Sequence, residues 1–435
     1  IASQLNLRPS LKRQLKNTDG WVNFCIGMKT ETGSMEQAIV FQNGHVSVLK
    51  YIPDNADATM RFINDEVLKE AAKITPNELL HLILNNQIIL DGNMAYLQAF
   101  NFFVSLILGK RYKKMMTRAN SLEIESREQK YAPQDPSISK DLNARKNSRL
   151  SADIIDSGVK FLDEPYLSRY NLDSFPKAKK LYELHTSTRP EISSERPVLL
   201  TQWYRDYGFE TDKNGKPWVP ELRQAHAYKY LMENKKPLIR ADSLIAGTIC
   251  PEQVSVVIYP DTVGTMIWGE LGSINDRLLA PYKISDQTAK DLHDLFPFWA
   301  KRTTRAWISK THNYPFCQRV DERFVASFNF KTVSMSHTVP DLPRFVNDGT
   351  YVMIEEIQQE IKMLEAQHTD KLTQSEQTEI VDKINTLESM KLCLEGLNTY
   401  AANLAQEAKC LAAKEADPKR KAELNQLHSI CQHVP

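Results

Sequence analysis

The adjacent carboxylates at positions 321 and 322 are the first candidates for chemistry in this sequence. Asp321 and Glu322 could act together as a general acid and a general base, which is a common use of paired carboxyl groups. However, Arg319 and Arg323 stand on either side of the pair. The four side chains would equally form an ordinary cluster of ion pairs, so both interpretations stay open at this point.

A metal centre is not predicted. His312, Cys317 and His337 lie in the same part of the chain, but their spacing matches no zinc motif. The cysteines are scattered and form no C-x-x-C pair, a pattern that favours reduced thiols over disulfides or a zinc site. They are Cys25, Cys250, Cys317, Cys393, Cys410 and Cys431. We therefore expect a cytoplasmic protein.

The bulk composition is that of a globular protein of more than one domain. The chain has 435 residues, of which 25% are charged and 42% are apolar. Its net charge of +1 disfavours nucleic-acid binding through a basic surface. The most apolar stretch, residues 99–108, is too short to span a bilayer, and residues 1–8 lack the apolar core of a signal peptide. We expect no membrane span.

The N-terminal section alternates strand and helix signals. Two β-prone runs within 35–50 meet at Asn43 and Gly44, a dipeptide that favours the positive φ angles of a tight hairpin turn. Thr75 and Pro76 are typical of a helix start. The expected elements after the hairpin are a strand over 58–63, a helix over 74–84, a strand over 87–92 and a helix over 94–108.

This order of elements resembles the sterol-carrier-type lipid-binding fold. The residues that carry the resemblance are Asn55 to Met60, Ile88 to Gly92 and the apolar helix that follows. The resemblance implies a small α+β domain over 1–111 that encloses an apolar tunnel. Alternatively, the apolar side chains of the last helix simply fill a small core. They are Phe100, Phe102, Phe103, Leu106 and Ile107.

Residues 112–150 are polar and basic and are interpreted as a linker. Residues 151–435 form the third section, which becomes helical after residue 345. Apolar residues at three- and four-residue spacing predict one helix around 353–364 and another around 380–394, and two further helices are expected over 401–413 and 418–431. The stretches 194–208 and 220–247 together predict helix–turn–helix–strand.

These last two stretches resemble the N-terminal half of glycyl radical enzymes of the pyruvate formate-lyase-like branch. The first helix carries Glu195 and Arg196, followed by Leu199, Thr201, Tyr204 and Arg205 in the family's order. The second element matches at Leu222, Arg223, Ala225, Ala227, Leu231, Met232, Glu233, Asn234 and Pro237, and the strand after it matches at Asp242, Leu244, Ile245, Ala246 and Gly247. Residues 336–341 and 415–435 also match.

The resemblance implies an α/β fold over 151–435: the N-terminal half of a ten-stranded α/β barrel with a helical outer layer. Residues 195–245 would pack on the outside of that barrel, where Arg196 and Arg223 would form structural ion pairs. Family members carry a G-C-x-x loop, whose cysteine forms the attacking thiyl radical, and an R-V-x-G loop, whose glycine stores the radical. Neither motif is present: no cysteine follows a glycine, and Arg319-Val320 leads into Asp321. Where this chain stops, the family continues.

We therefore expect this chain to have no catalytic residue of its own and to depend on a C-terminal half in the same or a separate polypeptide. The resemblance further implies a homodimer that binds no cofactor itself, and a radical S-adenosylmethionine activase that installs the radical. It implies a small substrate cleaved at a C–C or C–heteroatom bond by a lyase or decarboxylase. Pocket residues implied by the resemblance are Phe328 and Phe330 as an apolar wall, and Ser336 or His337 as a hydrogen-bonding group.

Those two phenylalanines favour an apolar or aromatic carboxylate as the substrate. Alternatively, Phe328 and Phe330 are ordinary strand core, and His337 caps a turn. A second hypothesis for the whole chain is a non-catalytic protein that binds a hydrophobic ligand or regulates a partner, with the half-barrel as a relic.

Overall fold

The computed structural model describes residues 1–71, 82–109, 175–241, 243–277, 281–311, 341–367 and 372–433. The chain forms two compact units, and each combines segments from different parts of the sequence. The first unit draws on 1–192, 252–256 and 260–333, and the second on 193–251, 257–259 and 334–435. The expected domain limits near residues 111 and 150 lie outside the described residues, so that division of the chain stays a prediction.

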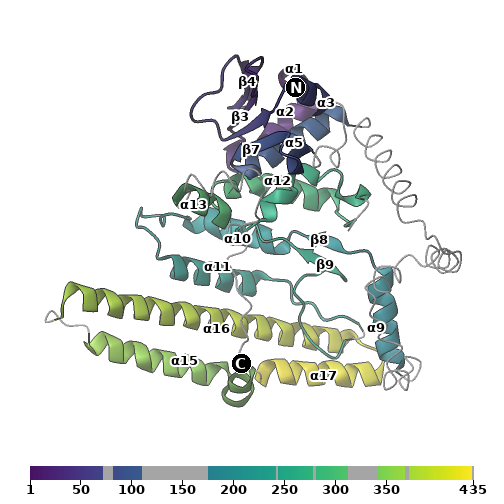
Figure 1. The fold of residues 1–435 in the computed structure, drawn as a ribbon. Helices are drawn as coiled ribbons and strands as arrows, with labels where there is room; N and C mark the ends of the chain where they lie inside the picture. Colours follow the sequence, from purple (N-terminus) through teal and green to yellow (C-terminus); the bar gives the residue numbers. More distant parts are fainter. Residues whose placement is uncertain are drawn as a thin grey trace, which may run out of the picture. The chain divides into compact units, whose positions relative to one another are not determined.

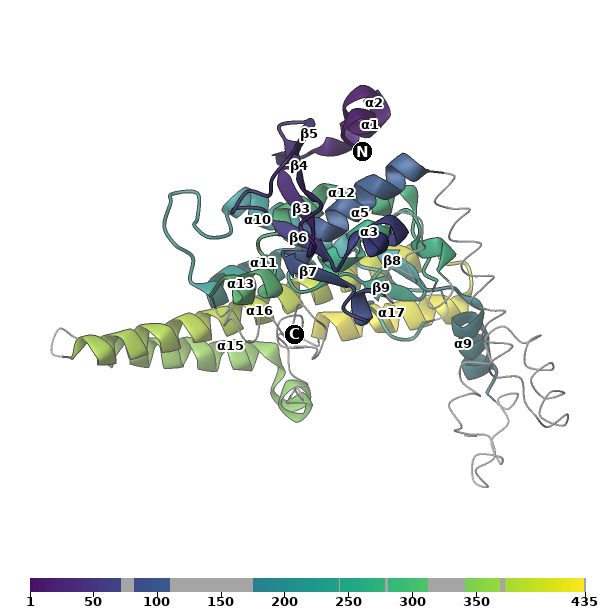
Figure 2. The same cartoon turned by 45° about the horizontal axis from the view of Figure 1, so that its top comes forward.

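The first unit is built on a five-stranded sheet with the strand order β5-β4-β3-β6-β7. Strands β3 and β6 are parallel, with Ile26 opposite Ala58, and the other neighbours are antiparallel. Figure 2 shows the strands together with helix α5, which packs on β3 and β6. The strands are β3 (Phe24–Thr30), β4 (Glu36–Gln42), β5 (His45–Leu49), β6 (Ala58–Phe62) and β7 (Ile88–Gly92), and α5 is Met94–Leu108.

These elements confirm the expected hairpin, the strands near 58 and 88 and the helix over 94–108. The expected helix over 74–84 lies mostly outside the described residues. Phe100, Phe102 and Phe103 of α5 are buried, and Phe103 stacks on Phe24 and Phe41 of the sheet. For these three side chains the structure agrees with the simple core. Smaller elements are α1 (Ala2–Leu7), α2 (Pro9–Lys12), η1 (Arg13–Leu15), β1 (Lys16–Asn17), β2 (Gly20–Trp21) and α3 (Asp65–Ala71).

The turn between β4 and β5 gives a direct test of the predicted hairpin. Asn43 and Gly44 have φ angles of 51° and 74°, which residues with a side chain adopt at a cost of about 1–2 kcal/mol. A Cβ at Gly44 would also lie 2.4 Å from the Trp21 ring. We expect Gly44→Ala to destabilise the protein by about 2 kcal/mol in thermal unfolding. The matched control is Gly33→Ala, because Gly33 has a φ of 76° but no neighbouring atom within 4 Å, so only the strain remains. An equal loss for both variants would contradict the steric part of this prediction.

A buried histidine joins the N-terminal segment to helices of the same unit. His293 of α12 (Asp286–Trp299) accepts a hydrogen bond at Nδ1 from the Trp268 indole at 3.1 Å and donates from Nε2 to the Gln14 carbonyl at 2.8 Å. Its ring stacks on Phe102 with centroids 4.4 Å apart. Trp268 lies in η5 (Gly264–Glu270), and the unit also contains η6 (Ile274–Asp276), α13 (Thr304–Thr311) and α9 (Pro176–Ser187).

The second unit is a helical assembly in which one long helix contacts three others. Figure 1 shows α16 (yellow-green) running beside α15, and the structure also packs α16 against α11 and α17. The capping box of Thr373 and Glu376 begins α16. The helices are α10 (Glu195–Tyr207), α11 (Pro220–Asn234), α15 (Leu342–Gln367), α16 (Gln374–Lys414) and α17 (Pro418–His433). The short strands β8 (Glu191–Ser193) and β9 (Ser255–Val257) pair with each other, and each has residues in both units.

Two expectations about this unit are wrong. The helical runs around 380–394 and 401–413 form one helix of 41 residues, which continues through Gly396. A Cβ at Gly396 would lie 2.9 Å from Lys229 Cα, so the glycine is needed where α16 crosses α11. The strand expected after α11 is also absent from residues 235–241 and 243–247. Side chains satisfy this segment's backbone instead: Arg420 donates to the carbonyls of Arg240 and Ser243.

The family motif on α10 and α11 has structural contacts. Glu195 accepts hydrogen bonds from Lys235 Nζ at 3.1 Å and from the Lys236 amide at 2.9 Å. Arg223 donates to the Phe209 carbonyl at 2.7 Å and stacks on that ring. Among the described residues Arg223 forms no ion pair, so that expectation is wrong. The guanidinium of Arg196 stacks on the Tyr259 ring.

The described residues contain no array of strands that could form part of a ten-stranded barrel, which stays a prediction. Their sheets have five, two and two strands. Within the same residues, no helix is both long and apolar enough to cross a membrane.

Candidate functional site

In the second unit, a groove with a volume of about 850 Å³ lies between α11, α15 and α16. We call it the helical groove. Its residues come from the inward sides of three helices. They are Glu221, Gln224, Ala225 and Tyr228 of α11, Arg344, Phe345, Met353, Glu356, Ile357 and Glu360 of α15, and Thr386, Leu387, Ser389, Met390, Cys393 and Leu394 of α16.

Local sequence explains why these helices lie so close together. Pro220 occupies the first turn of α11, where a missing amide costs nothing. Lys229 of α11 and Glu395 of α16 form an ion pair at 2.6 Å beside the Gly396 crossing. Thr350, just after the Gly349 kink of α15, donates to the Asn398 side chain of α16 at 2.6 Å. These contacts hold the three helices on both sides of the groove.

The floor of the groove is apolar and the rim is acidic. Ile357, Leu387 and Leu394 line it with two methionines, whose unbranched side chains adapt to irregular surfaces. Three of the four charged lining residues are glutamates. The fourth, Arg344, is bonded to Glu356 and lies 3.8 Å from Asp348.

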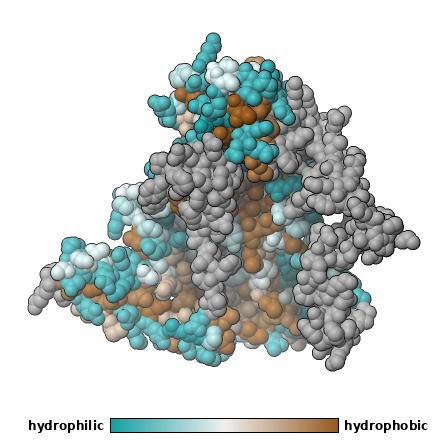
Figure 3. All heavy atoms as spheres, viewed as in Figure 1, coloured by the Kyte–Doolittle hydropathy of each residue, from teal (hydrophilic) through white to brown (hydrophobic). Residues whose placement is uncertain are grey.

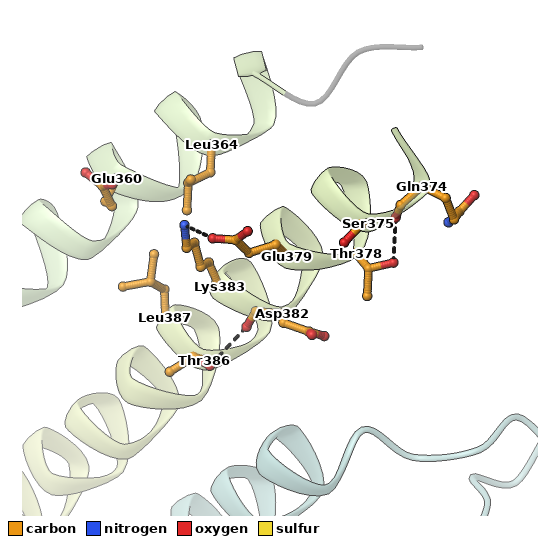
Figure 4. A pocket seen from close by; sticks show the side chains of 10 residues that line it. All are labelled: Glu360, Leu364, Gln374, Ser375, Thr378, Glu379, Asp382, Lys383, Thr386 and Leu387. Carbon is orange, nitrogen blue, oxygen red and sulfur yellow. Dashed lines mark hydrogen bonds and ion pairs between the residues drawn. The ribbon is translucent and has the colours of Figure 1, made fainter. Parts of the chain in front are cut away.

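A second, shallower hollow continues from the groove along α15 and the start of α16. Figure 4 shows its side chains, including Glu360 and Leu387, which also line the helical groove. Lys383 pairs with Glu379 at 2.7 Å within α16, and both side chains are more than half exposed. This end of the surface is therefore well solvated and acidic.

Burial favours the neutral forms of two side chains that line the groove, Cys393 and Tyr228, and of His226 on α11. Burial raises the pKa of the Cys393 thiol, and it also raises the pKa of Tyr228, to which the neighbouring Cys393 contributes while Arg196 opposes it. Burial likewise lowers the pKa of His226 on α11, with Lys229 acting in the same direction and Glu388 and Glu395 opposing. A neutral thiol and a neutral phenol are poor nucleophiles, so the groove suits binding rather than catalysis.

The side chains proposed from the sequence for substrate binding do not fall in this groove. Phe328, Phe330, Ser336 and His337 lie outside the described residues, as do Asp321 and Glu322. No group of three or more metal-binding side chains occurs in the described part of the chain.

From the sequence, Met353, Ile357, Leu387 and Leu394 are predicted to be parts of ordinary helix faces, and their common surface is not predicted. The signal was present in the sequence. The apolar stripe on α15 begins at Met353, but the residues of the stripe that are buried are Ile361 and Leu364, farther along the helix. The stripe is therefore longer than the part that α15 buries.

Comparison with known proteins identifies relatives for the C-terminal part of the chain. A family model described as "Pyruvate formate lyase-like" matches residues 171–435. An isethionate sulfite-lyase of Oleidesulfovibrio alaskensis is 28% identical over 276 residues, which cover 60% of this chain and 31% of that protein.

Two solved structures are also similar. The glycerol-bound form of the B12-independent glycerol dehydratase from Clostridium butyricum gives a TM-score of 0.52 at 23% identity. A glycyl radical enzyme from Archaeoglobus fulgidus gives a TM-score of 0.51 at 25% identity. Each match covers 60% of this chain and 31% of the other chain. The chain thus spans about a third of the length of the relatives it matches.

Proposed function

Because the chain belongs to the pyruvate formate lyase-like family, we propose that it forms part of a glycyl radical lyase or dehydratase. The observation that carries this proposal is the family match over 171–435, which includes the helices α10, α11, α15, α16 and α17. Similarity to a sulfite-lyase and to a glycyl radical enzyme supports it.

The role we assign to these 435 residues is structural. The contacts of Glu195 with Lys235 and of Arg223 with Phe209 hold α10 and α11 in place. No cysteine or glycine in this sequence occupies the family's radical motifs. The cysteine that attacks the substrate and the glycine that stores the radical would lie in further polypeptide, and an activating radical S-adenosylmethionine enzyme would install the radical.

The reaction we propose is cleavage of a C–O or C–S bond. The names of the relatives refer to a sulfite-lyase and a glycerol dehydratase. They give no support to decarboxylation or to the apolar or aromatic carboxylate suggested by Phe328 and Phe330. We propose a small hydroxylated substrate instead, and Ser336 and His337 remain our candidates for hydrogen bonds to it.

Electron paramagnetic resonance tests this function. The native protein, purified anaerobically and treated with an activating enzyme and S-adenosylmethionine, is expected to show a glycine-centred radical doublet and to release sulfite or water from a hydroxylated substrate. The 435-residue chain alone, treated identically, is expected to show neither. A native protein that shows no radical would favour the alternative, a non-catalytic binding or regulatory protein.

The role of the first unit is a separate proposal. The five-stranded sheet, its hairpin and helix α5 follow the element order on which the sterol-carrier resemblance rests. We propose that residues 1–111, which contribute the sheet and α5 to this unit, form a lipid-carrier-like domain added to the radical-enzyme part. The buried phenylalanines of α5 argue for a filled core at that position rather than a wide tunnel.

A further inference from the structure

The helices that form the groove also leave large apolar side chains exposed. Tyr351 and Met363 of α15 and Met390 of α16 are 63%, 52% and 51% exposed. Figure 3 shows apolar side chains gathering in the lower part of the view, over the region of α15, α16 and α17 in Figure 1. A groove with an apolar lining on the surface of a protein is a typical place for other polypeptide to pack.

We infer that this surface is the docking site for the polypeptide that the proposed function requires in addition to these residues. The inference rests on that function. The length of the relatives supports it, because the match covers only 31% of the sulfite-lyase and leaves more than two thirds of that protein outside. A continuation of that size must bury apolar surface against these residues, and the helical groove is an open, largely apolar surface that can receive it.

The charges at the groove predict the chemistry of the docking segment. Arg344 is neutralised by Glu356, whereas neither Glu221 nor Glu360 forms an ion pair within the described residues. A segment that fills the groove therefore carries basic side chains beside an apolar face. An amphipathic helix with lysine or arginine at its edges has that chemistry. The groove is lined by three helices and contains two methionines whose side chains adapt in shape, so it can hold a helix that lies along its length.

Cys393 is a native probe of the groove. It lines the apolar floor, and Cys410 lies on the same helix with intermediate exposure but outside the groove. The experiment measures alkylation of both thiols by a maleimide, peptide by peptide, using mass spectrometry. The isolated 435-residue chain is compared with native protein purified from the cells that make it, which on the proposed function contains the continuation, joined or separate. Each Cys393 rate is divided by the Cys410 rate.

We expect the normalised Cys393 rate to be at least tenfold lower in the native protein. Glu221→Lys combined with Glu360→Lys in the native protein is expected to restore most of the reactivity, because the edges of the groove then repel a basic segment. Equal Cys393 reactivity in both proteins would overturn the inference. So would protection in the isolated chain that grows with its concentration, since a second copy would then be the occupant. Radical formation is measured separately, so an active protein with a reactive Cys393 contradicts the docking site and leaves the proposed function standing.

Discussion

Replacing Glu195 by glutamine is expected to lower the free energy of unfolding of the second unit by about 3–5 kcal/mol. The Glu195 carboxylate lies 3.1 Å from Lys235 Nζ, and their side chains are 16% and 7% exposed. The ammonium of Lys235 also contacts the Ile249 carbonyl and lies 5.9 Å from the Tyr400 ring centre, but neither of these carries a compensating charge. Glutamine keeps the size of the side chain and leaves a buried cation without its counter-charge.

The measurement is urea denaturation combined with hydrogen exchange of the α10 and α11 amides. The matched control is Glu379→Gln on α16. The side chains of Glu379 and its partner Lys383 are 67% and 56% exposed, so their ion pair contributes less than about 1 kcal/mol. Adding Lys235→Met to Glu195→Gln removes the uncompensated charge and is expected to restore part of the loss. If Glu195→Gln and Glu379→Gln cost the same, the structural role that we assign to the motif is wrong.

Lowering the pH from 7 to 5 is expected to destabilise the first unit through His293. Burial lowers the pKa of this histidine, although its hydrogen bond to Gln14 and the neighbouring Asp294 oppose the shift. In the unfolded chain the histidine takes up a proton near pH 6.5, whereas the folded chain does not. The contribution of His293 to the free energy of unfolding is therefore fully present above this pH. It decreases as the pH falls towards the pKa of the folded state, with a slope approaching about 1.4 kcal/mol per pH unit.

The geometry explains the resistance to protonation. Nδ1 of His293 accepts the hydrogen bond of the Trp268 N–H, so protonation of Nδ1 would place two hydrogen-bond donors opposite each other. His293→Gln can keep both hydrogen bonds without titrating, and we expect it to flatten the pH profile of hydrogen exchange in α12. His45→Gln, at an exposed position of β5, serves as the control and should leave the profile unchanged. A profile as steep in His293→Gln as in the unaltered protein would exclude His293 as its cause.

The sequence alone determined the local elements and the family. The hairpin at Asn43 and Gly44, the bounds of α5 and the helices α10 and α11 depend on turn residues, helix starts and apolar spacing within about fifteen residues. The family depended on ordered motifs in α10, α11 and α17, whose residue types and spacing can be recognised in the sequence alone. Arg223 shows the limit of such inference: its type was recognised, but its partner is the carbonyl and ring of Phe209.

Only the tertiary structure decided what the long-range contacts do. Apolar spacing cannot tell whether a stripe is buried by this chain or left open, so Ile361 and Leu364 looked the same as Met353 and Ile357. The packing of α15 on α16 buries the first pair and leaves the second in the helical groove. His293 likewise acquired its role because Gln14, Phe102 and Trp268, far apart in sequence, meet at its ring. These differences follow from burial, and burial is a property of the folded chain as a whole.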